Sequence, residues 1–421
     1  MSTPPLEPSE HPPDRPERPA RSTVPRAPAA ALARVGVGVV RCALVVRLLD
    51  EWWSWLPAGT IDDQVRDLGL SYGQAGWLLA LLTVGGLVGS PLAALADRGH
   101  RRLLATTGAL LIAAGLSTFA LAAPFPVLVV AATVLGGASD MMIRPLESSL
   151  ADTADGELDR LLGRQHLLTW AGDFVAPALL AIGAATVIGW RGVFTFTVVV
   201  FVAFAALLAS TSFPAPVPAA DGEDPSLLRS ARTLLRHREL WLLTAAEFAL
   251  LPLDEAFLGF AVARAAAEGD NAAAQLLAGG VVVGGLAGAA VVSRRGLDRP
   301  LVTLGCGLLV VGACLTAAPL AMPVTITALA LVGGGTAIVW AKVHHRMLTL
   351  VPLRSATVPT LVGLLSTPAL LVPVAMGVTA DRVSITASLV GTALLAIPLA
   401  AVVLALGGGR VSPDELEDLD D

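Results

Sequence analysis

Long apolar runs, separated by short polar connections, fill the chain from residue 35 to residue 407. A helix needs about 20 mostly apolar residues to cross a bilayer, where its backbone groups can bond only to one another. The pattern predicts twelve such helices, at residues 35–61, 73–95, 103–122, 125–150, 164–188, 192–212, 239–263, 272–293, 300–319, 323–350, 355–379 and 383–407. The expected fold class is therefore an all-α integral membrane protein.

The composition supports a membrane protein and argues against several other classes. Of the 421 residues, 55% are hydrophobic and 15% are charged, which is more apolar surface than a soluble domain can bury. Cys42, Cys306 and Cys314 all lie in apolar runs, which predicts small core residues rather than a disulfide framework or a metal site. No basic stripe with interleaved aromatic residues suggests nucleic acid, and no cofactor is expected.

Polar segments divide the chain into five expected parts. Residues 1–33 are expected to form a disordered cytoplasmic tail, because the first 28 are rich in Pro, Arg, Glu and Ser and lack the apolar core of a signal peptide. The other parts are a six-helix bundle at 34–212, a cytoplasmic linker at 213–238, a second six-helix bundle at 239–407 and an acidic cytoplasmic tail at 408–421. Arginines concentrate in the connections that lie on the same side of the membrane as the N-terminus. This predicts a multi-pass protein of the inner (plasma) membrane with both termini in the cytoplasm.

Four short motifs recur in the same helix order in both halves, which indicates an internal repeat. The numbering offsets are 204, 199, 198 and 191 in chain order, and the alternative is chance similarity in apolar sequence. The matched segments are Leu49-Asp50-Glu51 with Leu253-Asp254-Glu255, Val84 to Gly89 with Val283 to Gly288, Gly136-Gly137 and Arg144 with Gly334-Gly335 and Lys342, and Pro177 to Leu180 with Pro368 to Leu371.

The connection after the second expected helix carries an acid and several arginines. Asp97, Arg98, Arg101 and Arg102 can pin two helix ends together and release them as the halves move, which makes them candidate gating residues. The alternative is a positively charged anchor on the cytoplasmic side without a gating role.

This connection resembles the signature of the major facilitator superfamily between its second and third helices. Two positions depart from that signature, because Ala93 replaces the leading glycine and His100 stands where the second glycine is usual. The resemblance covers about residues 34–407 and extends to compact bacterial members of the family. It implies twelve helices in two pseudo-symmetric six-helix bundles, with helices one, four, seven and ten around a central cavity.

Ionisable residues gather in these same four expected helices, with one more in the fifth. A charge in the hydrocarbon region costs several kcal/mol, so it usually faces protein or water and has a function. The residues expected to bind substrate or couple protons are Arg47, Asp50, Glu51, Asp140, Arg144, Glu147, Asp173, Glu247, Asp254, Glu255, Lys342, His345 and Arg346.

Helical spacing suggests partners for these charges. Asp254 or Glu255 is expected to face Lys342, and Asp50 or Glu51 to face Arg144, in pairs that open to a proton or a charged solute. The alternative is permanent ion pairs that only hold helices together. His166 suits either proton coupling or a solvated helix end. The three tryptophans Trp52, Trp53 and Trp55 suit either a substrate surface or an interfacial belt.

These features predict a proton-coupled secondary transporter rather than an enzyme, because no nucleophile or metal constellation is present. The expected partners are a small organic solute, protons and the lipid bilayer, and the protein is expected to be a monomer. The acidic and aromatic residues of the first helix favour export of a drug-like or metabolite compound. The alternatives are proton symport of an anionic or zwitterionic metabolite, and a sensor or scaffold that transports nothing.

Overall fold

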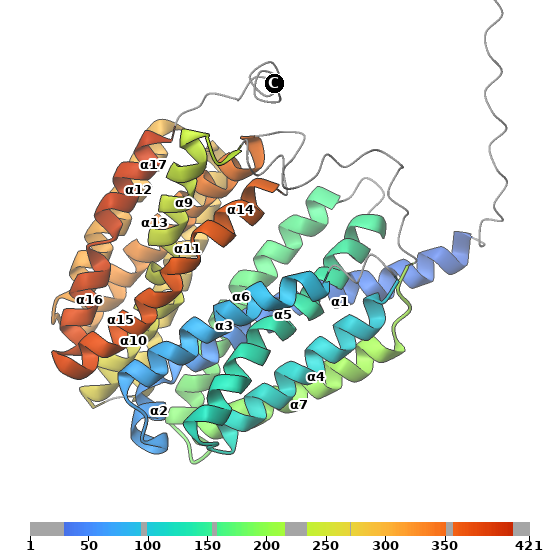
Figure 1. Ribbon diagram of the computed structural model, residues 1–421, viewed down its shortest axis with the longest axis horizontal. Helices are drawn as coiled ribbons and strands as arrows, with labels where there is room; N and C mark the ends of the chain where they lie inside the picture. Colours follow the sequence, from blue (N-terminus) through green and yellow to red (C-terminus); the bar gives the residue numbers. More distant parts are fainter. Residues whose placement is uncertain are drawn as a thin grey trace, which may run out of the picture.

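The computed structural model describes residues 29–93, 99–153, 158–214, 234–269, 271–350 and 357–406, and every regular element in these ranges is a helix. Figure 1 shows two helical bundles that follow each other along the chain. The first contains α1 (Ala29–Gly59), α2 (Ile61–Leu68), α3 (Tyr72–Ala93), α4 (Arg101–Ala120), α5 (Phe125–Thr153), α6 (Leu158–Ala184) and α7 (Gly189–Ser210). The expected tails and most of the expected linker lie outside the described residues.

The second bundle contains more and shorter helices than the first. Its elements are α9 (Arg238–Leu250), η2 (Leu251–Leu253), α10 (Glu255–Ala267), α11 (Asn271–Arg295), α12 (Arg299–Ala317), α13 (Met322–Thr349), α14 (Thr357–Leu365), η4 (Thr367–Leu370), α15 (Leu371–Arg382), α16 (Ile385–Ala393) and α17 (Ala396–Ala405). Pro252 and Pro368 lie in the 3-10 segments η2 and η4, where a missing N–H interrupts the helical hydrogen bonds.

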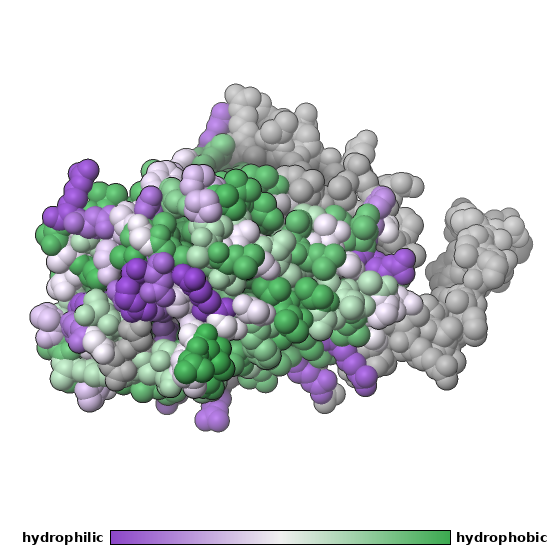
Figure 2. All heavy atoms as spheres, turned by 90° about the horizontal axis from the view of Figure 1, so that it is seen from below, coloured by the Kyte–Doolittle hydropathy of each residue, from purple (hydrophilic) through white to green (hydrophobic). Residues whose placement is uncertain are grey.

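Nine helical stretches in the described part of the chain are long and apolar enough to cross a membrane. Three expected spans fall outside this set: the charged helix α1, the broken segment α9 to α10, and the broken segment α14 to α15. The apolar side chains Leu103, Val130 and Val199 are more than half exposed, as lipid-facing residues are. Figure 2 shows broad apolar areas on one face, interrupted by a compact hydrophilic area. The protein is thus a multi-pass membrane protein.

Glycines bring corresponding helices of the two bundles into backbone contact. A Cβ on Gly85 would lie 2.0 Å from the Thr133 carbonyl oxygen, and one on Gly284 would lie 1.9 Å from that of Ala330. Helix α3 therefore packs on α5 as α11 packs on α13, because only glycine permits such an approach. The internal repeat inferred from the motifs thus has a counterpart in the helix packing.

The same contacts correct the repeat register in α5 and α13. A Cβ on Gly89 would lie 2.5 Å from the Gly137 carbonyl oxygen, and one on Gly288 would lie 2.6 Å from that of Gly334. Gly137 therefore corresponds to Gly334 and not to Gly335. The offset shortens by one residue, so Arg144 and Lys342, which the motifs had matched, are not equivalent.

The two bundles meet tightly at one end, called here the closed end, where α1 ends at Gly59 and α3 begins at Tyr72. A Cβ on Gly76 would lie 2.2 Å from the Pro373 carbonyl oxygen, and Asp381 of α15 accepts hydrogen bonds from the Tyr72 and Gly73 amides, both at 2.8 Å. The opposite end, called the open end, is where α1 begins and α17 ends. Figure 1 shows the bundles converging where α2, α10 and α15 lie.

Candidate functional site

A central cavity of about 640 Å³ lies between the two bundles. It reaches from Trp55 and Leu258, deep between the bundles, to Ser293 near the end of α11 at the open end. Its walls come from α1, α5, α6, η2 with α10, α11 and α13, so both halves contribute. This volume fits a small organic molecule.

Four of the carboxylates that line the central cavity form a cluster and belong to three helical segments. Glu51 comes from α1, Asp173 from α6, and Asp254 and Glu255 from the junction of η2 and α10. Glu51 interacts electrostatically with the other three and with Asp50, which places all five carboxylates close together. Such a cluster repels itself and is stable only when protons or cations neutralise it.

Local backbone structure explains why these side chains face inward. Arg47, Glu51 and Trp55 are spaced four residues apart on the unbroken helix α1, so they share one face, and all three line the cavity. Asp254 stands at the break between η2 and α10, where the chain turns and leaves both acids exposed to the cavity. A broken helix at the binding site is a recurring feature of secondary transporters.

Among the described residues, Arg47 is the cationic side chain that lines the cavity. Its charge is already balanced by a carboxylate outside the cluster. It forms an ion pair with Glu147 of α5, which also lines the cavity. Asp50 turns toward α5, where it accepts a hydrogen bond from Ser139 Oγ at 2.5 Å. It also accepts one from Trp53 Nε1 of its own helix α1 at 3.0 Å. The first half therefore compensates part of its own charge and leaves Glu51 to the cavity.

Aromatic side chains cover the remaining walls. Trp55, Trp170, Phe257 and Trp340 line the cavity, and Trp170 packs where α6 crosses α11 at Gly285. Of the three tryptophans that follow Asp50 and Glu51, only Trp55 lines this cavity within the described residues. Trp52 packs near Phe196 with ring centroids 5.8 Å apart, and Trp53 donates to Asp50.

The basic residues of α13 lie away from the carboxylates. Lys342, His345 and Arg346 are absent from the described cavity wall, whereas Trp340 and Ala341 contribute to it. Arg346 is 4% exposed and pairs with Glu239 at the start of α9. In the described part of the chain no ion pair joins Lys342 to Asp254 or Glu255 in this conformation, so this pairing stays a prediction.

Arg144 also lies off the cavity, on an exposed part of α5. Its Nε lies 3.3 Å from an oxygen of Asp140, one turn earlier on the same helix, and the expected pair with Asp50 or Glu51 does not form in the described structure. Glu247 is half-buried on α9 and interacts electrostatically with Asp254. The expected charges therefore separate into cavity carboxylates and intrahelical or intrabundle pairs.

Parts of the expected gate lie outside the described residues. Asp97 and Arg98 belong to that group. The side chain of His166, a separate candidate for proton coupling, also lies outside the described residues. At the start of α4, Arg101 is 4% exposed and Arg102 is exposed. The gating role of this connection stays a prediction.

Residues 42–358 match the profile of the Major Facilitator Superfamily. No curated protein matches the chain. Three solved transporters share its fold at low sequence identity. The xylose transporter XylE from E. coli, in an inward-open conformation, has a TM-score of 0.69 and 14% identity over 91% of this chain and 99% of its own. The nucleoside transporter NupG has a TM-score of 0.69 and 11% identity over 89% of this chain and 100% of its own. A bacterial homologue of the human lysosomal transporter Spinster, inward-facing and unoccupied, has a TM-score of 0.64 and 14% identity over 90% of this chain and 98% of its own.

Proposed function

Because the chain belongs to the major facilitator superfamily, a family of transporters, we propose that it exchanges protons for a small organic cation by alternating access. The observation that carries this proposal is the cluster of Glu51, Asp173, Asp254 and Glu255 in a cavity with aromatic walls. The lining cation Arg47 is already paired with Glu147, so the cluster keeps a negative charge that a ligand can neutralise.

Protons and an organic cation neutralise the same carboxylates, which couples their movements. When a cation leaves, the cluster becomes unstable unless protons replace it, and protonation in turn weakens binding of the next cation. This competition produces exchange, so a proton gradient directed inward drives the solute outward. We therefore favour export over uptake.

The aromatic walls define the solute further. Trp55, Trp170 and Trp340 offer ring faces to a cation and apolar area to its carbon skeleton. The open end is the cytoplasmic end in this proposal, because both termini are assigned to the cytoplasm. The cavity is then accessible from the side on which an exporter loads.

Symport of an anionic metabolite, the second possibility from the sequence, has less support. It relied on the basic residues of α13 and on Arg144, and neither group lies on the described cavity wall. A scaffold without transport activity has no evident use for an acidic cavity between its halves. Neutralising the cluster distinguishes this last possibility from a transporter.

Flux in proteoliposomes tests the proposal. Purified protein would be reconstituted with an imposed pH gradient, and movement of ethidium and of tetraphenylphosphonium would be followed with and without a protonophore. We expect gradient-dependent flux that falls by roughly tenfold or more in Glu255→Gln and Glu51→Gln, since losing about 1.4 kcal/mol of interaction is a factor of ten.

Glu268→Gln is the matched control, because it removes an exposed carboxylate at the end of α10 away from the cavity. Its flux should equal that of the unmodified protein. Flux that ignores the pH gradient, or full activity in both cavity variants, would rule out proton exchange through this cluster.

A further inference from the structure

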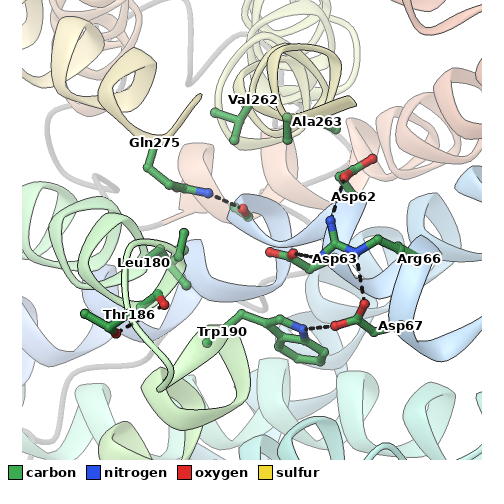
Figure 3. A pocket seen from close by; sticks show the side chains of 15 residues that line it. Asp62, Asp63, Arg66, Asp67, Leu180, Thr186, Trp190, Val262, Ala263 and Gln275 are labelled. Carbon is green, nitrogen blue, oxygen red and sulfur yellow. Dashed lines mark hydrogen bonds and ion pairs between the residues drawn. The ribbon is translucent and has the colours of Figure 1, made fainter. Parts of the chain in front are cut away.

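A second, smaller cavity lies at the closed end and is called here the closed-end pocket. It has a volume of about 180 Å³ and takes its walls from both bundles, with Asp62, Asp63 and Asp67 of α2 on one side and Gln275 of α11 on the other (Figure 3). Neither the proposed exchange nor the central cavity uses these residues.

One helical turn separates this pocket from the central cavity on four helices. The pairs that line the central cavity and the closed-end pocket, in that order, are Trp55 and Gly59 on α1, Pro177 and Leu180 on α6, Leu258 and Val262 on α10, and Ala278 and Gln275 on α11. Residues three or four apart on a helix rise by about 5 Å. The two cavities therefore lie in line between the bundles.

Trp55 and Leu180 form much of the partition between the cavities. A Cβ on Gly59 would lie 2.7 Å from Trp55 Nε1 and 2.8 Å from Leu180 Cδ1, so the partition is tightly packed around this glycine. A solute that leaves the central cavity toward the closed end passes this layer and then enters the closed-end pocket.

The closed-end pocket is negatively charged. Arg66 is the guanidinium shared by three carboxylates, at 2.5 Å from Asp63, 3.0 Å from Asp67 and 3.6 Å from Asp62. Tyr72 and Trp190 donate further hydrogen bonds to Asp62 and Asp67, at 3.1 Å and 2.9 Å. Arg191 also interacts electrostatically with Asp67. These two positive charges against three negative charges leave the group with an excess of one negative charge that a cation can balance.

Gln275 supplies an independent sign of a ligand. It is 6% exposed, and its Nε2 donates to the Gly59 carbonyl oxygen at 2.7 Å, which fixes the orientation of the amide (Figure 3). Its Oε1 is buried and accepts no hydrogen bond from the described residues. A buried acceptor without a donor costs about 1–3 kcal/mol, so a ligand with an N–H group would stabilise this wall.

We propose that the closed-end pocket binds the ammonium group of the transported solute, held by Asp63 and Gln275, after the solute has passed Trp55. The chemical class follows from acceptors on both sides of the pocket and from its excess negative charge. The volume of about 180 Å³ admits an ammonium group with a short alkyl chain. The identity of the solute rests on the proposed function, whereas binding of an ammonium does not.

Protection of an introduced cysteine tests this site in purified protein. Ala266 lines the closed-end pocket, so Ala266→Cys would be labelled with a neutral maleimide in a Cys314→Ala background, since Cys42 and Cys306 are buried. Ethylammonium chloride should slow labelling severalfold, and Asp63→Asn should abolish that protection. Sodium chloride at equal ionic strength and ethanol, a neutral analogue, should leave the rate unchanged.

Val187→Cys is the matched control, because Val187 is fully exposed in the turn between α6 and α7 and does not line the pocket. Unchanged labelling of Ala266→Cys in ethylammonium, equal protection by sodium, or equal slowing at Val187→Cys would overturn the proposal. If Asp63→Asn fails to fold, the comparison of ethylammonium chloride with sodium chloride in Ala266→Cys still tests the proposal. Labelling needs no flux: protection without cation flux supports the pocket and counts against the transport proposal, and flux without protection rejects the pocket alone.

Discussion

Replacing Gly76 with alanine should open the closed end. The glycine lies where α3 of the first bundle crosses α15 of the second, and a Cβ there would lie 2.2 Å from the Pro373 carbonyl oxygen. Ordinary carbon contacts begin near 3.4 Å, so the two helices must separate by roughly 1 Å to admit the methyl group. Backbone atoms cannot rotate away as a flexible side chain would.

The magnitude follows from the cost of overpacking, which is about 1–3 kcal/mol for an added methyl group in a packed interface. That cost applies while the closed end is closed and disappears once the bundles separate there. The equilibrium between the two states should therefore move toward the open arrangement by roughly 5- to 150-fold.

Distances between spin labels would measure this shift without any assumption about membrane orientation. Leu121→Cys after α4 and Val383→Cys after α15 are both strongly exposed at the closed end, one on each bundle. In a Cys314→Ala background, Gly76→Ala should lengthen the main label distance or add a longer population.

Two glycines of the same chain provide controls. A Cβ on Gly279 meets nothing within 4 Å, so Gly279→Ala should leave the distances unchanged. Gly85→Ala inserts a methyl group between α3 and α5 of one bundle, 2.0 Å from the Thr133 carbonyl oxygen, and should lower stability without separating the bundles. An unchanged distance distribution in folded Gly76→Ala protein would refute the reasoning.

Two other groups lead to predictions that can be checked by unfolding and by spectroscopy. Glu239→Gln should lower the free energy of unfolding by about 3 kcal/mol, because it breaks the ion pair between Glu239 and the buried Arg346 guanidinium. Thermal unfolding measures this, and an equal loss in the exposed Glu268→Gln would contradict it. Burial disfavours the charged form of Asp67, yet the hydrogen bond from Trp190 and the pairing with Arg66 outweigh it and lower the pKa of this carboxyl. Stabilisation by a carboxyl with a lowered pKa is present above its ordinary pKa of about 3.9 and is lost as the pH falls through the folded value. The fluorescence difference between the unmodified protein and Trp190→Phe should therefore stay flat from neutral pH down to about pH 4 and change only below it; a change near pH 6 would show that another group controls this contact.

The family and the all-helical membrane fold could be predicted from the sequence, because apolar runs long enough to cross a bilayer leave few alternatives. The breaks in the seventh and eleventh expected helices were missed, although Pro252 and Pro368 mark both. Proline is common enough in membrane helices that its presence alone does not predict a break. The helix α2 was also missed, since a single amphipathic stretch of eight residues looks like a loop.

The acids of the central cavity were predicted, but their partners were not. Periodicity shows which residues of one helix share a face, and it does not show which face meets the other bundle. On α13 the cavity face carries Thr336 and Trp340, which puts Lys342 and Arg346 on other sides of the helix. The three consecutive glycines Gly333, Gly334 and Gly335 likewise permit more than one register in the sequence, and the helix contacts, such as that of Gly288 with Gly334, decide between them.

The three expected spans that are too charged or too broken to count as membrane-crossing helices all contact other helices of the two bundles. This affects how the protein is inserted into the membrane. Segments α1, α9 to α10 and α14 to α15 contact one another or the opposite bundle, as in the contacts of α1 with α10 and of α15 with α3. These contacts cover part of each segment with protein, and a charged residue such as Glu51 or Asp254 is tolerated in the membrane only where it faces protein or water. Insertion of such segments depends on helices synthesised later, so the first bundle should remain incompletely integrated at α1 until the second emerges from the ribosome.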